Sequence, residues 1–110
     1  MENIAFIKNF VWGRVTNTDK PKEVKEIFNG PRCRLMSVEL RDNEFLPKHA
    51  AIEPITVFCL AGNGTFRAGE DLADEQQLVA GTLLTLAGGV AHEVVAEPDL
   101  SLLVTKFKAE

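Results

Sequence analysis

The chain lacks two features that would point to an obvious partner: a long apolar run and an excess of positive charge. No apolar stretch among its 110 residues approaches the ~20 residues that a membrane-spanning helix needs. Lys and Arg number 12 against 16 Asp and Glu, and they are scattered along the chain. A protein surface that binds nucleic acid needs clustered positive charge. The sequence therefore argues against both a membrane and a nucleic acid as partner.

Cysteine is scarce, with only Cys33 and Cys59 in the chain. The start of the sequence is acidic, Lys8 interrupts its apolar residues, and no small-residue cleavage site follows, so no secretory signal is indicated. Disulfides are rare in the reducing cytoplasm. We therefore expect a cytoplasmic protein in which both cysteines are free, buried thiols.

Short apolar runs separated by turn-forming residues dominate the chain. Asn29-Gly30 lies between alternating runs at 22–28 and 32–40, which is a strong hairpin pattern because both turn residues tolerate positive φ. Residues 3–16 fit either a short helix or a strand. Regularly spaced short strands predict a single all-β domain over residues 1–110. Further strands are predicted at 54–61, 65–68, 75–79, 82–86, 90–96 and 100–107, with turns at 41–44, 62–64, 69–71 and 97–99.

Two of these strands, 54–61 and 82–86, are apolar on both faces. Strands of this kind are normally covered on both sides. In so small a domain, the core covers one face and a second subunit is available to cover the other, which predicts a homodimer. Phe10 and Trp12 are expected to cover the barrel or to lie in the dimer contact.

The only two histidines each lie in one half of a glycine-punctuated pattern. The first half runs from His49 to Gly62, and the second runs from Gly81 through Gly89 to His92. This pattern resembles the paired motifs of the cupins, small β-barrels whose histidines point inward and usually hold a metal. The resemblance covers residues 38–105. It implies an RmlC-like, double-stranded β-helix (jelly-roll) barrel with both histidines in its interior.

The chain departs from the cupin pattern at two positions where cupins place metal ligands. Ala51 stands at the second histidine and Ile55 at the glutamate of the first motif. A third ligand beside the two histidines would have to be Glu53 or Cys59. The chain has no tyrosine, so the His/Tyr acid–base pair of the sugar-nucleotide epimerases with this fold is not available.

Strand alternation predicts which side chains share the interior with the histidines. The predicted pocket is mainly apolar, with two imidazoles and one thiol. Arg32 and Arg34 alternate with apolar neighbours, so either one reaches the barrel mouth and binds an anion or both lie on a solvated edge strand. The predicted lining residues are His49, Ala51, Ile55, Val57, Cys59, His92 and Val94.

Three functions remain open at this point. The favoured one is binding of a small-molecule ligand in the cavity, with His49 and His92 as the polar contacts and no tightly bound metal. The second is a metal-dependent enzyme of the dioxygenase or isomerase type, in which the same histidines ligate Zn, Fe, Mn or Ni. Two imidazoles fall short of the three or four ligands of a zinc site. The third is a structural or regulatory module with a vestigial pocket, so whether the protein is an enzyme stays undecided.

Overall fold

The structure is a computed structural model that describes residues 4, 6–8, 10 and 20–109. The predicted first segment at 3–16, with Trp12, lies largely outside these residues. In the described part of the chain no helix is long and apolar enough to span a membrane. The all-β prediction is confirmed. The strands are β1 (Lys22–Asn29), β2 (Cys33–Leu40), β3 (Phe45–His49), β4 (Ile55–Ala68), β5 (Asp74–Val79), β6 (Leu83–Leu86) and β7 (His92–Phe107).

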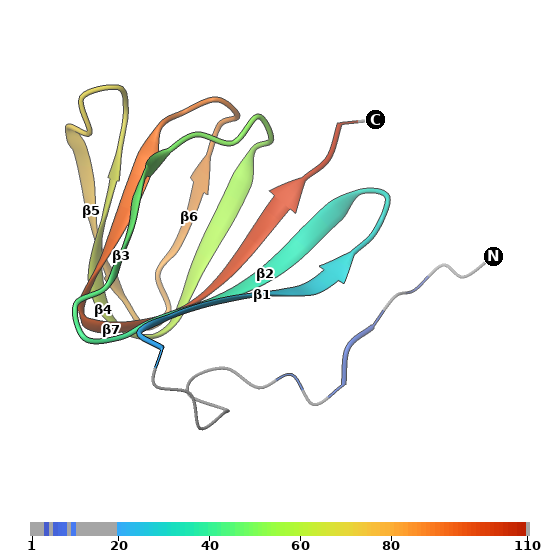
Figure 1. Cartoon of the computed structure of the whole chain (residues 1–110). Coiled ribbons are helices and arrows are strands. Elements are labelled where there is room, and N and C mark those ends of the chain that lie inside the picture. Colours follow the sequence, from blue (N-terminus) through green and yellow to red (C-terminus); the bar gives the residue numbers. More distant parts are fainter. Residues whose placement is uncertain (1–3, 5, 9, 11–19, 110) are drawn as a thin grey trace.

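Two long strands, β4 and β7, pair with each other and carry the remaining strands. The first part of β4 pairs with β6 and its second part with β5. The first part of β7 pairs with β3, and its second part pairs with β2, which in turn pairs with β1. Every pairing is antiparallel. The sheet therefore folds over on itself about β4 and β7, and two walls face each other (Figure 1).

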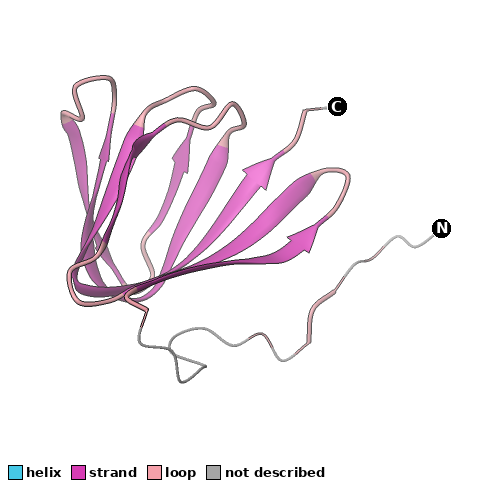
Figure 2. Ribbon diagram, viewed as in Figure 1, coloured by secondary structure: helices cyan, strands magenta, loops and turns pink. Residues whose placement is uncertain are grey.

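We call these walls by their edge strands. The β1 wall consists of β1, β2, the second part of β7, the first part of β4 and β6. The β3 wall consists of β3, the first part of β7, the second part of β4 and β5. The strands of both walls rise from one common edge, where β4 and β7 bend (Figure 2).

The bend in β4 follows from two interruptions of its pairing with β7. The register shifts between Cys59 and Ala61 and again between Gly62 and Gly64. Gly62 adopts a φ of 94°, a left-handed conformation that favours glycine. A Cβ atom at this position would lie 2.0 Å from the carbonyl oxygen of Asp99. Gly62 thus allows β4 to pass close to β7 at the bend.

Two predicted turns are therefore wrong. Residues 62–64 lie inside β4 instead of forming a hairpin turn, and residues 65–68 continue the same strand. Residues 97–99 are a bulge inside β7, where three residues lie opposite Asn63 of β4. Glycine, proline and aspartate mark both bulges and turns, because each interrupts regular strand pairing.

The other predicted connections are confirmed. β1 and β2 form the predicted hairpin, and the Gly30 amide donates to the carbonyl oxygen of Cys33 at 3.0 Å. The turn at 41–44 brings Asp42 and Asn43 into positive φ. β5 and β6 match the strands predicted at 75–79 and 82–86 to within one residue at their ends.

The apolar core lies on the inner faces of both walls. Full burial of one such side chain contributes about 1.5–3 kcal/mol, so the buried residues of β2, β4, β5 and β7 stabilise the folded sheet. Cys33 and Cys59 are both free, as the sequence predicts, but only Cys59 is buried and Cys33 is partly exposed. The buried core residues are Val38, Leu40, Ile55, Val57, Cys59, Phe66, Ala68, Leu78, Val94, Ala96, Leu100 and Leu102.

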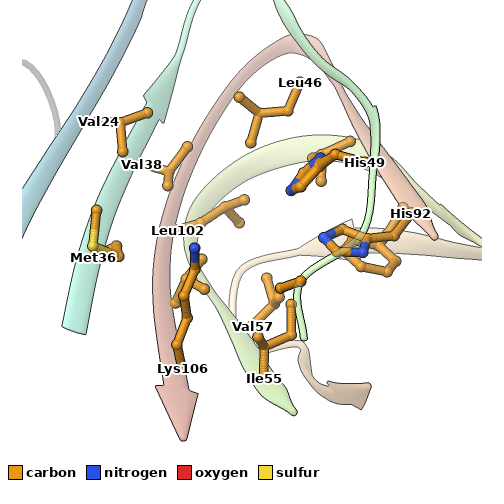
Figure 3. A pocket seen from close by; sticks show the side chains of 14 residues that line it. Val24, Met36, Val38, Leu46, His49, Ile55, Val57, His92, Leu102 and Lys106 are labelled. Carbon is orange, nitrogen blue, oxygen red and sulfur yellow. The ribbon is translucent and has the colours of Figure 1, made fainter. Parts of the chain in front are cut away.

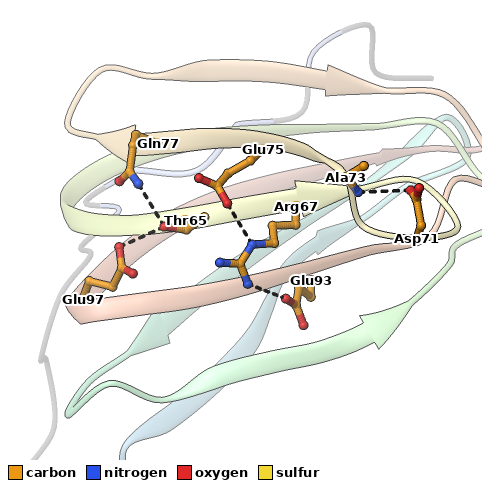
Figure 4. A network of polar contacts seen from close by, with 8 residues as sticks. All are labelled: Thr65, Arg67, Asp71, Ala73, Glu75, Gln77, Glu93 and Glu97. Carbon is orange, nitrogen blue, oxygen red and sulfur yellow. Dashed lines mark hydrogen bonds and ion pairs between the residues drawn. The ribbon is translucent and has the colours of Figure 1, made fainter.

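The outer face of the β3 wall carries a group of polar side chains beside the exposed Phe45 and Val79. Arg67 of β4 lies between two carboxylates, with 3.0 Å from its Nε to Glu75 Oε1 and 3.1 Å from its Nη1 to Glu93 Oε1 (Figure 4). On the same strand, the Thr65 hydroxyl donates to Glu97 Oε1 at 2.9 Å. The Arg67 side chain is 41% exposed on this face, whereas Thr65 is only 3% exposed.

Candidate functional site

A cavity of about 190 Å³ lies between the two walls (Figure 3). Its lining combines apolar side chains from both walls with three nitrogen-bearing ones. The apolar lining residues are Val24, Met36, Val38, Leu46, Ala51, Ile55, Val57, Phe66, Val94, Leu102 and Val104, and the nitrogen-bearing residues are His49, His92 and Lys106.

The structure brings six of the seven predicted lining residues to this cavity. They are His49, Ala51, Ile55, Val57, His92 and Val94. The seventh, Cys59, lies in the core with no exposed surface and does not line the cavity. Burial raises the pKa of the Cys59 thiol, although a hydrogen bond with the backbone of Ala61 acts in the opposite direction. A thiol of this kind is structural rather than nucleophilic.

The two imidazoles lie side by side at one end of the cavity. His49 of β3 and His92 of β7 are cross-strand partners. Their ring centroids are 4.3 Å apart, with the ring planes inclined at 58°. Phe66 of β4 stacks on the other side of His92, at 5.5 Å between centroids. Two residues far apart in the sequence therefore converge in one hollow.

Backbone hydrogen bonds orient both rings in the same way. The carbonyl oxygen of Pro47 lies 2.9 Å from His49 Nδ1, and that of Val90 lies 3.0 Å from His92 Nδ1. A carbonyl oxygen only accepts, so each Nδ1 carries a hydrogen and donates it. In the neutral ring, Nε2 then has a free lone pair. Figure 3 shows a nitrogen of each ring directed into the cavity.

The surroundings of His92 favour its neutral form. Burial lowers its pKa most strongly, and the charges of His49 and Lys106 lower it further. The hydrogen bond to the Val90 carbonyl raises the pKa but does not offset the burial. At neutral pH, His92 therefore presents a hydrogen-bond acceptor to the cavity.

The two histidines do not complete a metal site with the side chains around them. Donation from Nδ1 to a carbonyl is the usual arrangement of a metal-ligating imidazole. However, residues 4, 6–8, 10 and 20–109 contain no group of three or more His, Cys, Asp or Glu that could hold a metal ion. Neither Glu53 nor Cys59 lines the cavity. The donor set ends at two imidazoles, fewer than protein-held zinc requires.

Sequence reasoning missed Lys106, the third nitrogen-bearing residue of the cavity. Leu102, Val104 and Lys106 alternate along β7, and all three line the cavity. A lysine that continues an inward apolar row was the available signal. Sequence reasoning also missed seven apolar lining residues that lie outside the segments of the two histidines. They are Val24, Met36, Val38, Leu46, Phe66, Leu102 and Val104.

Comparison with known proteins identifies the fold. No protein-family model matches the sequence, and no curated protein matches it significantly. Among solved structures, the chain is similar to a cupin superfamily protein from Desulfitobacterium hafniense, with 10% identity, a TM-score of 0.76 and coverage of 86% of this chain and 84% of that one. It is also similar to a conserved protein of unknown function from Streptococcus pyogenes, with 13% identity, a TM-score of 0.76 and 99% of each chain covered.

A third similar structure carries an explicit description of its fold. It is an RmlC-like cupin with a double-stranded β-helix from Methanocaldococcus jannaschii, with 15% identity, a TM-score of 0.72 and 93% of each chain covered. At such identities, a shared structure establishes the fold and leaves the activity to be argued from the site. The chain has the double-stranded β-helix (jelly-roll) fold of the RmlC-like cupins.

Proposed function

We propose that this chain binds a small, largely apolar molecule in the cavity between its two walls, with His49 and His92 as hydrogen-bond acceptors. The observation that carries the proposal is a concave apolar lining in which a few polar groups converge, the general form of small-molecule sites. An engineered apolar cavity of about 150 Å³ holds benzene. A hollow of about 190 Å³ therefore suits a ligand of one ring or a short branched chain.

The histidines define the polar part of such a ligand. Each ring uses Nδ1 for the backbone, so each Nε2 is left as an acceptor at this end of the cavity. His92 is 4% exposed, whereas His49 is exposed to solvent. An acceptor that a bound ligand shields from water costs about 1–3 kcal/mol if it is left without a partner. A ligand that carries a hydroxyl or N–H group should therefore bind better than one of equal size without a donor.

Thermal unfolding in the presence of matched ligand pairs tests this proposal. Phenol should raise the melting temperature more than fluorobenzene, which has nearly the same size and no donor, because a ligand of the native state stabilises it by mass action. In the double variant His49→Ala/His92→Ala, phenol and fluorobenzene should raise the melting temperature equally. Thr56→Ala on the outer side of β4 is the control and should keep it. Failure of every compound in a broad metabolite set to stabilise the protein would favour a vestigial pocket.

A second candidate is a metal-dependent enzyme of the dioxygenase or isomerase type. One observation favours it: both imidazoles donate from Nδ1 to a carbonyl and leave Nε2 free, as metal-ligating histidines do. Metal analysis of protein purified without chelator or a nickel column separates the two candidates. Stoichiometric Fe, Mn, Ni or Zn that disappears in the double histidine variant would reverse their order.

A further inference from the structure

The charged side chains that line the cavity are of one sign. Among the lining residues the structure describes, no carboxylate is present, and Lys106 is the side chain with a permanent positive charge. Its charge contributes to lowering the pKa of His92, so the Lys106 ammonium lies close enough to the His92 imidazole to act on it electrostatically. Figure 3 shows the Lys106 nitrogen directed into the cavity, beside Leu102.

A neighbouring pair of charges is already neutralised. Arg34 is the cross-strand partner of Lys106 on β2. Arg34 Nε lies 2.9 Å from Glu26 Oε1 of β1, so these two side chains compensate each other. The ion pairs formed within the described ranges do not include Lys106. Glu26 is thus used by Arg34 and does not pair with Lys106.

An uncompensated ammonium beside apolar side chains has a clear physical preference. Charges interact more strongly where apolar walls exclude water than they do in bulk solvent. A concave site with charge of one sign also concentrates ligands of the opposite sign. Lys106 is only half-buried, so its stem packs against the lining while its charged end stays available to an incoming group.

Building on the proposed binding function, we propose that the cavity selects small organic monoanions, carboxylates in particular, over neutral molecules of the same shape. The anionic group pairs with Lys106 Nζ, and the apolar body fills the hollow between the walls. A hydroxyl or N–H substituent, where the ligand has one, donates to His49 or His92. An apolar lining rejects inorganic anions, since these gain nothing from it and lose their hydration.

Matched acids and amides test the selection directly. Benzoate with benzamide, and isovalerate with isovaleramide, differ in charge and hardly in size. In NMR titrations of labelled protein at constant ionic strength, each acid should bind about tenfold more tightly than its amide, because a hydrogen bond between charged groups is the stronger kind. Lys106→Met should abolish the preference by weakening the acid, and Lys106→Arg should preserve it.

The control carries the same change of charge at a remote position. Lys25 is exposed on β1 and follows Val24, which lines the cavity, so alternation directs Lys25 to the opposite face. Lys25→Met should leave the preference for acids intact. Melting curves of all variants should show one cooperative transition, which verifies that each variant is folded.

The possible results separate this inference from the function on which it rests. Equal binding of acid and amide, or a preference that survives Lys106→Met, would overturn the selection of anions while cavity binding stands. Phosphate binding as tightly as benzoate would overturn the organic part of the inference. Binding by neither acids nor amides would overturn both proposals together.

Discussion

At the scale of single residues, His92 is the side chain whose chemistry depends most on its environment. It is 4% exposed and stacks on Phe66. Its pKa is lowered from the ordinary value of 6.5, mainly by burial. The unfolded chain then takes up a proton at His92 before the folded chain does. The free energy of unfolding is therefore fully maintained above pH 6.5 and decreases as the pH falls below that value, down to the folded pKa.

This linkage gives a measurable prediction for the metal-free protein. Between about pH 7 and pH 5, the free energy of unfolding from urea titrations should decrease more in the wild type than in His92→Gln. The other titrating groups are the same in both proteins, so the difference isolates His92. An NMR titration of the His92 ring should have its midpoint below 6.5, and Lys106→Met should move the midpoint upward. A midpoint at or above 6.5 would contradict the argument.

At the scale of strands, the sequence predicted correctly where the backbone becomes irregular. It did not predict whether the irregular residues form a turn or lie inside a strand. The patterns at 62–64 and 97–99 mark real interruptions, but the two lie opposite each other inside two long strands, with the extra residues on β7. A local window does not reveal whether the chain keeps its partner after the interruption, because the pairing of β4 with β7 joins distant segments.

The residues of the candidate site were likewise predicted where they are close to the histidines in the sequence and missed where strand pairing brings them in from afar. The motif spacing identified lining residues near the histidines, but Val24 and Met36 enter the cavity through the pairing of β1 with β2 and of β2 with β7. Cys59 shows a second limit. Strand alternation correctly placed Cys59 on the inner face with Ile55. Alternation does not show, however, how far along the strand the cavity extends. Four residues along a strand carry Cys59 about 13 Å, beyond the cavity.

Two glycines with nearly the same φ test the close approach of β4 to β7. Gly62 and Gly81 have φ of 94° and 92°, but a Cβ atom at Gly81 meets nothing within 4 Å. Gly81→Ala should therefore cost only the left-handed conformation, about 1–2 kcal/mol. Gly62→Ala should cost about 1–3 kcal/mol more, because its Cβ overlaps the Asp99 carbonyl. Equal losses in urea denaturation would show that β4 and β7 do not approach each other so closely.

At the scale of the whole molecule, the outer faces of the two walls differ in character. The β3 wall presents Arg67 with its two glutamates. The β1 wall instead presents a cross-strand row of Leu83, Phe58 and Leu103 on β6, β4 and β7. Leu83 is 63% exposed, and the other two are partly exposed. We call these three residues the apolar row. A contiguous apolar surface on one side of a small protein is typical of an interface.

We expect the apolar row to lie at the interface of a homodimer. Pairing of two copies about a twofold axis would cover the same row on each of them, and light scattering at micromolar concentration should then give a mass of twice 12.1 kDa. Leu83→Asp places a charge at the end of the row and should shift the mass toward one chain. Ile52→Asp, at a 91% exposed position outside the row, should leave the dimer intact. A wild-type mass of one chain would refute the interface, and dissociation by both variants would place it elsewhere on the surface.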